Sequence, residues 1–146
     1  GVYTHRSKFE APLPVVWEAL VAPNLKQQWM QNMLSVDVQR PAGRIGPGSD
    51  YHCAHEAADF RYSVTDWEPF DYFSTLMKDP ANEGLAMHET YALTPTETGT
   101  EVRYTMGPLL DQDGQRHEAE EADVIAFLKG FWPDSFDTLA KMLKRT

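Results

Sequence analysis

The chain has 146 residues, of which 42% are hydrophobic and 24% charged, and its formal net charge is −9. These values are typical of a soluble globular protein, and we expect a single domain over residues 1–146. The negative charge argues against nucleic acid or an anionic membrane surface as a partner. The sequence contains no run of about 18 apolar residues, so we expect no integral membrane span. The only cysteine, Cys53, has no internal disulfide partner, so we expect a reducing, cytoplasmic location. The start at Gly1 rather than Met leaves open a neighbouring domain in a longer protein, and a homodimer is open as well.

The first part of the chain predicts one strand followed by two short helices. Residues 2–11 (VYTHRSKFEA) alternate imperfectly and contain residues that favour strands, so we expect a strand that ends at a pair of prolines. Pro14 suits the first turn of a helix, and we predict that helix over residues 14–21. A second short helix is predicted over residues 25–32, after a break at Pro23.

Alternating patterns then predict six more strands, separated by turn signals rich in Gly, Pro and Asp. These strands cover residues 34–40, 49–57, 60–68, 72–78, 85–93 and 100–106. The connection at residues 41–48 contains a Pro-Ala-Gly and a Gly-Pro-Gly turn, and residues 79–84 form a polar loop. Strands joined by short connections form an antiparallel sheet, and the helices must cover one face of it.

A long helix is predicted over residues 118–144. Apolar residues recur along it every three or four positions, which makes one broad apolar stripe that needs an apolar partner. Its first turn is acidic and its last turn is basic, as the helix dipole favours. Pro133 lies inside this pattern, shortly after Gly130. We expect this proline to bend or divide the helix near Phe131 and to open space beneath it for a ligand.

Five strings of residues, in this order, resemble strings of the START/birch-pollen-allergen-like (SRPBCC) superfamily, nearest to its polyketide cyclase/dehydrase-like members. They are FEAPLPVVWEAL (9–20), PNLKQQW (23–29), GPGS (46–49), VTDWEPF (64–70) and YALTPTETGTEVRYTM (91–106). The resemblance implies an α+β helix-grip fold, in which a curved seven-stranded antiparallel sheet wraps around the long C-terminal helix and two short helices lie between the first two strands. It also implies a cavity between sheet and helix. Members share no single set of catalytic residues, so the fold alone does not define the function.

Because alternate side chains of a strand face the same way, the resemblance also predicts which residues line the cavity. Leu93 and Val102, which it places in the core, set the register of the last two strands. Counting by two from them turns Glu89 and Tyr104 inward as candidate catalytic groups. The predicted ligand-binding residues are Trp29, Tyr51, Cys53, Met87, Tyr91, Met106, Phe131, Ser135 and Leu139.

A buried carboxylate at Glu89 is costly unless it is paired or protonated. With a raised pKa and a hydrogen bond to His55 or a tyrosine, Glu89 would serve as a general acid or base, and Tyr104 would orient a carbonyl group. A slip of one residue in the strand register gives the opposite result. It puts Glu89 and His55 in solvent and turns His88 and Thr90 inward.

The sequence contains no strong metal or cofactor motif. It lacks a Gly-rich phosphate loop, a GxSxG elbow, an HExxH pair and a CxxC pair. His52, Cys53 and His55 come nearest to a metal cluster, but strand alternation puts His52 on the opposite face. Two ligands remain where zinc needs three or four, so we predict neither a metal nor a cofactor.

Three functions are open at this point. The first is binding of a hydrophobic small molecule, such as a lipid, polyketide or aromatic metabolite, in the cavity. The second is a polyketide cyclase/dehydrase-like or hydrolase-like enzyme that uses acid–base chemistry at Glu89 and His55. The third is a protein-interaction domain, as in chaperone-associated members of the superfamily. A cavity with a few convergent polar groups favours the first two, and a filled interior favours the third.

Overall fold

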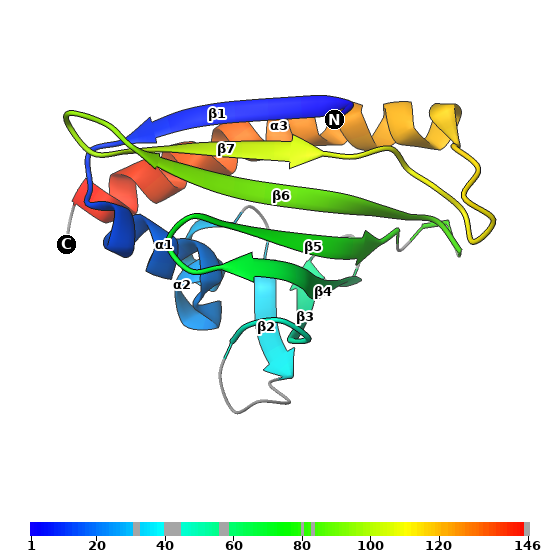
Figure 1. Cartoon of the computed structure of the whole chain (residues 1–146), viewed down its shortest axis with the longest axis horizontal. Helices are drawn as coiled ribbons and strands as arrows, with labels where there is room; N and C mark the ends of the chain where they lie inside the picture. The colour runs from blue at the N-terminus through cyan, green and yellow to red at the C-terminus, as the bar shows by residue number, and fades with distance from the viewer. Residues whose placement is uncertain (31–32, 40–44, 56–58, 80, 83, 145–146) are drawn as a thin grey trace.

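In the part of the chain that the computed structural model describes, seven strands form one antiparallel sheet, and three helices cover one face of it (Figure 1). The strands are β1 (Tyr3–Phe9), β2 (Met33–Gln39), β3 (Asp50–His55), β4 (Asp59–Glu68), β5 (Tyr72–Lys78), β6 (Ala86–Pro95) and β7 (Thr100–Met106). The helices are α1 (Leu13–Val21), α2 (Pro23–Trp29) and α3 (Glu118–Lys144). The predicted α+β helix-grip fold is therefore confirmed.

The structure describes residues 1–30, 33–39, 45–55, 59–79, 81–82 and 84–144, with residues 33–36 and 55 described by their backbone alone. Parts of five predicted segments fall outside this range: residues 31–32 of the second helix, 40 of the second strand, 41–44 of the long connection, 56–57 of the third strand, and 80 and 83 of the polar loop. Within the described residues, the strands at 72–78 and 100–106 and the helix at 118–144 match the predicted bounds. The first strand is shorter than predicted, because it ends at Phe9.

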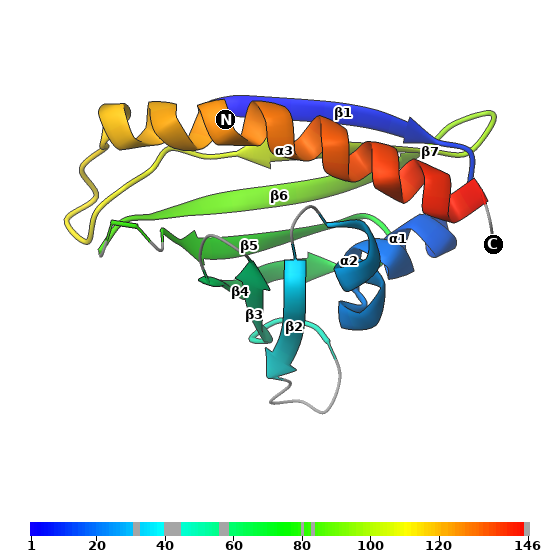
Figure 2. The same ribbon diagram turned by 180° about the vertical axis from the view of Figure 1, so that it is seen from behind.

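The order of strands across the sheet is β1-β7-β6-β5-β4-β3-β2, so the first two strands of the chain form opposite edges. The helices α1 and α2 carry the chain from one edge to the other. Irregular register in β4, between Val64 and Asp66, and in β2 accompanies a strong curvature of the sheet. In Figure 2, β2 and β3 run across the direction of the other strands, next to α2.

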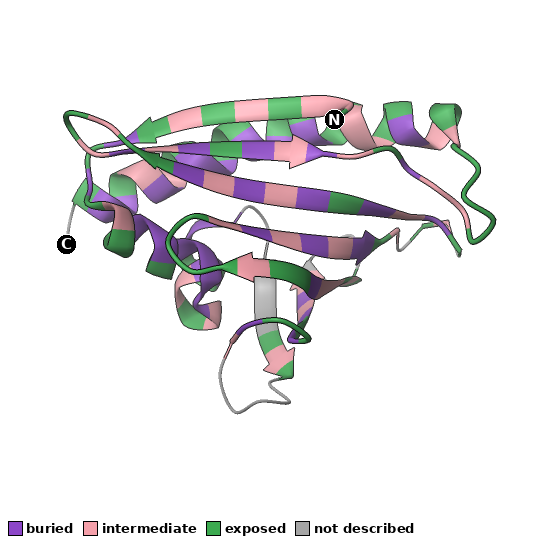
Figure 3. Cartoon of the chain, viewed as in Figure 1, coloured by how far each residue is buried: buried purple, intermediate pink, exposed green. Residues whose placement is uncertain are grey.

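Strand alternation decides which side chains face the helices (Figure 3). In β6, Met87, Glu89 and Tyr91 are buried, whereas His88 is exposed. The predicted inward register of this strand is therefore confirmed, and the slipped register with His88 inside is wrong. The pairing of β6 with β7 agrees with this register, since Tyr91 lies opposite Tyr104.

The C-terminal half of α3 packs on the sheet through an aromatic cluster. Trp132 and Phe136 on α3 lie 5.1 Å apart between ring centroids, and Phe136 also contacts Phe9 of β1 at 5.6 Å and Trp29 of α2 at 5.8 Å. The buried residues of α3 are Glu121, Leu128, Phe131, Trp132, Ser135, Phe136, Leu139, Met142 and Leu143. Their spacing is the predicted apolar stripe, so burial of this stripe holds the helix in the grip of the sheet.

Pro133 does not divide α3, which runs without a break over 27 residues. The proline lacks an N–H and leaves the carbonyl of Lys129 without its helical partner. Pro133, Gly130 and Lys129 all face solvent, where water can bond that carbonyl. Of the two predicted outcomes, a bend or a division, the helix shows no division for this reason, and its axis changes direction part-way along in Figure 2. Among the described residues, no helix combines the length and apolar character needed to cross a membrane.

Candidate functional site

A cavity of about 360 Å³ lies between the sheet and the N-terminal half of α3, beside the connection from β5 to β6. Its walls are mainly apolar, and its acidic and amide groups lie at the mouth and the base. The lining residues are Met30, Phe60, Tyr62, Met77, Asp79, Ala81, Asn82, Glu89, Tyr91, Glu120, Asp123, Val124, Phe127, Leu128, Phe131 and Trp132. A concave apolar space with few polar groups is the usual form of a small-molecule site.

The base of the cavity carries the carboxyl group of Glu89, which is only 2% exposed. The Tyr104 hydroxyl donates a short hydrogen bond to Glu89 Oε2, whereas Oε1 has no hydrogen-bond partner among the described residues. Burial raises the pKa of Glu89 to about 7, and the Tyr104 hydrogen bond and the charge of Lys26 act in the opposite direction. The cavity thus ends in a carboxyl group that changes charge near neutral pH and has one free acceptor.

Two further polar atoms lie beside the hydrogen-bonded pair of Glu89 and Tyr104. Thr75 Oγ1 interacts with Glu89 and Trp132 Nε1 with Tyr104, and each interaction lowers the pKa of the group it faces. Neither atom makes a hydrogen bond of normal geometry within the described residues. Burial and the nearby Glu89 raise the pKa of Tyr104 well above its usual value, so Tyr104 remains a neutral donor.

Lys26 of α2 is a buried cation close to the cavity base but not part of its lining. Its ammonium lies 5.0 Å from the ring centroid of Tyr51 and 5.9 Å from that of Tyr62, over their faces. Burial lowers the pKa of Lys26, while Cys53 and Glu89 raise it. Lys26 and Glu89 form no ion pair in the described part of the chain, so they interact only at longer range.

The structure divides the predicted site residues between the cavity and the core. Glu89, Tyr91 and Phe131 line the cavity, and Tyr104 contacts it through Glu89. The remaining predicted residues lie outside the lining: Trp29, Tyr51, Cys53, Met87, Met106, Ser135 and Leu139. The side chain of His55 lies outside the described residues, so its predicted pairing with Glu89 stays a prediction.

Several of these positions are filled core for a clear physical reason. Trp29 is 1% exposed and donates to the Ala19 carbonyl at 2.7 Å, so it lies in the core and not in the ligand-binding position predicted for it. Tyr51 likewise donates to the Val21 carbonyl at 2.6 Å. Ser135 and Leu139 lie along the aromatic half of α3, where large rings already occupy the space.

The sequence interpretation did not select the acidic mouth or Lys26. Val124 and Leu128 are four residues apart and precede Phe131 on the same helix face, so the apolar stripe itself contained the signal for this wall. Lys26 lies three residues before the buried Trp29, which places both on one face of α2. This spacing in the sequence could have indicated that Lys26 is buried together with Trp29.

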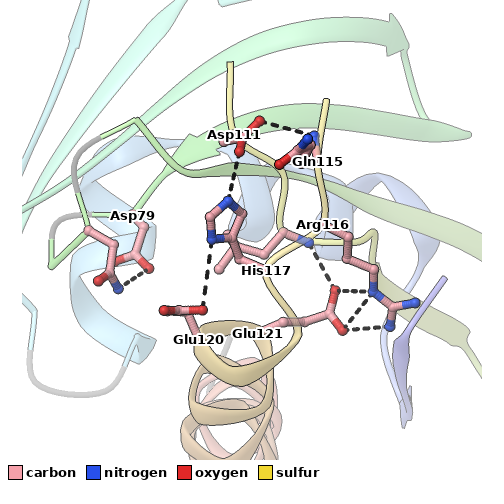
Figure 4. Close-up of polar contacts among 9 residues, drawn as sticks. Asp79, Asp111, Gln115, Arg116, His117, Glu120 and Glu121 are labelled. Carbon is pink, nitrogen blue, oxygen red and sulfur yellow. Dashed lines mark hydrogen bonds and ion pairs between the residues drawn. The ribbon is translucent and has the colours of Figure 1, made fainter. Parts of the chain in front are cut away.

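Hydrogen bonds and ion pairs connect the first turn of α3 to the segment that precedes it (Figure 4). Glu121 accepts from the backbone N–H of Leu109 at 3.0 Å and from Arg116 Nη2 at 2.6 Å. His117 lies between two acidic groups, 2.8 Å from Asp111 and 3.9 Å from Glu120. Because Glu120 belongs to the cavity mouth, this network holds the mouth in position.

Replacing Glu121 with Gln should lower the free energy of unfolding by about 1 kcal/mol or more, since the charge-assisted bonds to Arg116 are lost. The Arg116 hydrogen bond lowers the pKa of Glu121. The stabilisation is therefore present above the unfolded pKa and is lost as pH falls through the folded pKa. Chemical denaturation at pH 7 measures the change. Glu118→Gln is the matched control, because its side chain is 78% exposed and 3.7 Å from Arg116, and it should change little.

A larger depression of about 500 Å³ lies on the opposite face of the sheet. It is polar, and its side chains come from β2 to β5, including Asp50, His52 and Arg61. His52 is 3.4 Å from Asp59 on this face. The smaller cavity under α3 is the better candidate site, because it combines apolar walls with a buried carboxyl group.

A model of the Activator of Hsp90 ATPase homolog 1-like protein family matches residues 10–144. The chain belongs to this family. Activator of Hsp90 ATPase homolog 1-like proteins fall within the SRPBCC superfamily, so the predicted superfamily membership is confirmed. No curated protein matches the sequence.

Solved structures with the same fold include protein MLL2253 from Mesorhizobium loti. It is 26% identical, with a TM-score of 0.75, and the match covers 99% of this chain and 97% of that one. DynU16, a protein of the dynemicin biosynthetic locus, is 20% identical with a TM-score of 0.70, over 97% of this chain and 46% of that one. Ara h 8.0201 is 13% identical with a TM-score of 0.72, over 99% and 97% of the two chains. These three similar structures support the helix-grip fold of this chain.

Proposed function

We propose that this chain binds a hydrophobic small molecule, such as a lipid, polyketide or aromatic metabolite, in the cavity between the sheet and α3. The observation that carries the proposal is the apolar cavity of about 360 Å³ that ends in the buried carboxyl group of Glu89. Burying an apolar ligand against these walls would contribute about 25 cal/mol for each Å² removed from water. The polar base would orient the ligand.

Filling the cavity tests this proposal. Leu128 lines the cavity and is 6% exposed, so Leu128→Trp should occupy the space that a ligand needs. We expect the affinity for the neutral fluorescent dye N-phenyl-naphthylamine to fall about tenfold or more, as steric exclusion from a ligand pocket costs at least 1.4 kcal/mol. Fluorescence titration measures the affinity, and circular dichroism checks that the variant is folded.

Ala126→Trp is the matched control for this test. Ala126 lies on the exposed face of the same helix, two residues away, and is not part of the lining. It introduces the same side chain and should leave dye binding unchanged. If the unmodified chain binds no dye, or if folded Leu128→Trp binds as well as Ala126→Trp, the proposed function is wrong.

An acid–base enzyme of the cyclase/dehydrase or hydrolase type is the second candidate function. The pKa of Glu89, about 7, and the Tyr104 hydrogen bond support it, because a general acid or base works best near its own pKa. Glu89 would take or give the proton and Tyr104 would donate to a substrate carbonyl. Chemical conversion of a bound ligand that is lost in Glu89→Gln while binding persists would favour this candidate over a pure binding protein.

The family name refers to an activator of the Hsp90 ATPase, which makes a protein-interaction role the third candidate. That role predicts a filled interior and a continuous exposed apolar patch. The cavity under α3 supports ligand binding instead. Among the described residues, the exposed Phe127 lies at the cavity, whereas the exposed Val15 and Phe70 lie on α1 and beside Trp17 of α1, outside the cavity lining.

A further inference from the structure

Every charged side chain in the cavity lining is acidic. Asp79, Glu120 and Asp123 lie at the mouth and Glu89 at the base, and no Lys, Arg or His is part of the described lining. The nearest buried cation, Lys26, faces a separate void of about 10 Å³ beside Tyr62. An anionic ligand such as a fatty acid would therefore meet like charges along the lining, and no cation of the described lining would receive its head group.

The base of the cavity also contains an unused acceptor. Glu89 is 2% exposed, and its Oε2 accepts from Tyr104, whereas Oε1 has no partner within the described residues. A buried carboxylate is costly unless donors satisfy both oxygens. Oε1 is itself closed off from solvent and lies beside Thr75, so a donor on a bound ligand would reach it from the cavity only when a neighbouring side chain shifts.

We propose that the ligand of this cavity is an amphiphilic amine, whose protonated nitrogen bonds Glu89 Oε1 and whose apolar body packs against Leu128 and Phe131. The ammonium would donate a charge-assisted hydrogen bond and would lie near the rings of Tyr62 and Tyr91, which favour a cation. The acidic mouth would attract the same charge from solution. This inference rests on the proposed function, since it specifies the chemistry of the ligand that the cavity takes.

Three compounds with one apolar body test the inference: phenylbutylamine, phenylbutanol and phenylbutyrate. Isothermal titration calorimetry at pH 7 should show that the amine binds about tenfold or more tightly than the alcohol, because it adds a charged hydrogen bond. The carboxylate should bind most weakly. In Glu89→Gln, the preference for the amine over the alcohol should disappear while the alcohol keeps its affinity.

Asp134→Asn is the matched control, because it removes one negative charge from an exposed position on α3 that is not part of the cavity lining. Salt screens that position, so the amine should keep most of its preference. Equal binding of amine and alcohol by the unmodified chain, or a preference that survives in Glu89→Gln, would overturn the inference. In both cases binding of the alcohol and the neutral dye would leave the proposed function standing. Dye binding without binding of any of the three compounds would also overturn the inference alone, and absence of all binding would overturn both.

Discussion

Replacing Phe136 with alanine should lower the free energy of unfolding by about 3–5 kcal/mol, the usual cost of removing a large buried ring. Phe136 is 2% exposed and its ring lies within 5.8 Å, between centroids, of Phe9, Trp29 and Trp132. These rings come from β1, α2 and α3, so no single element can move to fill the space. Urea denaturation followed by circular dichroism measures the loss.

Phe127→Ala is the control for this prediction. It makes the same substitution on the same helix, but Phe127 is 57% exposed and should lose less than about 1 kcal/mol. A similar loss in both variants would show that the aromatic cluster does not anchor α3. A change confined to Phe136→Ala would show that the C-terminal half of the helix holds the fold together.

The second large effect concerns pH and Glu89. Stability should fall by roughly 2.5 kcal/mol between about pH 5 and pH 8 because of this group alone. Burial raises the folded pKa from 4.5 to about 7, so the folded state holds the proton over a range in which the unfolded state has lost it. As pH rises through this range, the folded state must take up a buried negative charge, and the stability falls.

Comparison with Glu89→Gln isolates this effect from other titrating groups. Burial lowers the pKa of His5, which works in the opposite direction over part of the same range. The amide of Gln can still accept from Tyr104 but never becomes charged, so the variant should be more stable than the unmodified chain above pH 7. Urea denaturation of both proteins from pH 5 to pH 8 measures the difference. If the free energies of unfolding of the two proteins changed in parallel with pH, the raised pKa of Glu89 would be contradicted.

A buried group that lowers stability at neutral pH is expected at a functional site, where a chain keeps a residue for reasons other than folding. If Glu89→Gln is both more stable and unable to select the amine, the same carboxyl group has opposite effects on stability and on binding. A purely structural residue would not give this combination.

The sequence predicted the elements well, because period-two and period-3.6 patterns record which face of each element is buried. The resemblance, which placed Leu93 and Val102 in the core, predicted that Glu89 faces inward, while a slip of one residue remained open.

The sequence placed space for a ligand beneath Phe131, which lines the cavity, but it did not predict that the cavity continues toward Glu120 and stops short of Ser135. That extent depends on whether facing side chains fill the space, and the rings of Trp29 and Phe136 do so at one end only. Patterns of hydrophobicity along the chain contain no information on such volumes.

The two halves of α3 consequently differ in how firmly they are held. From Trp132 onward, aromatic rings pack the helix against the sheet, whereas the N-terminal half spans a void and is held by the buried Leu128 and by the polar contacts of Glu121 and His117. A partial lifting of the first turns, with the distal end as a pivot, would open the cavity to a guest molecule. Entry and exit rates would then depend on a few surface ionic contacts, and the overall resistance of the chain to unfolding would have little influence on them.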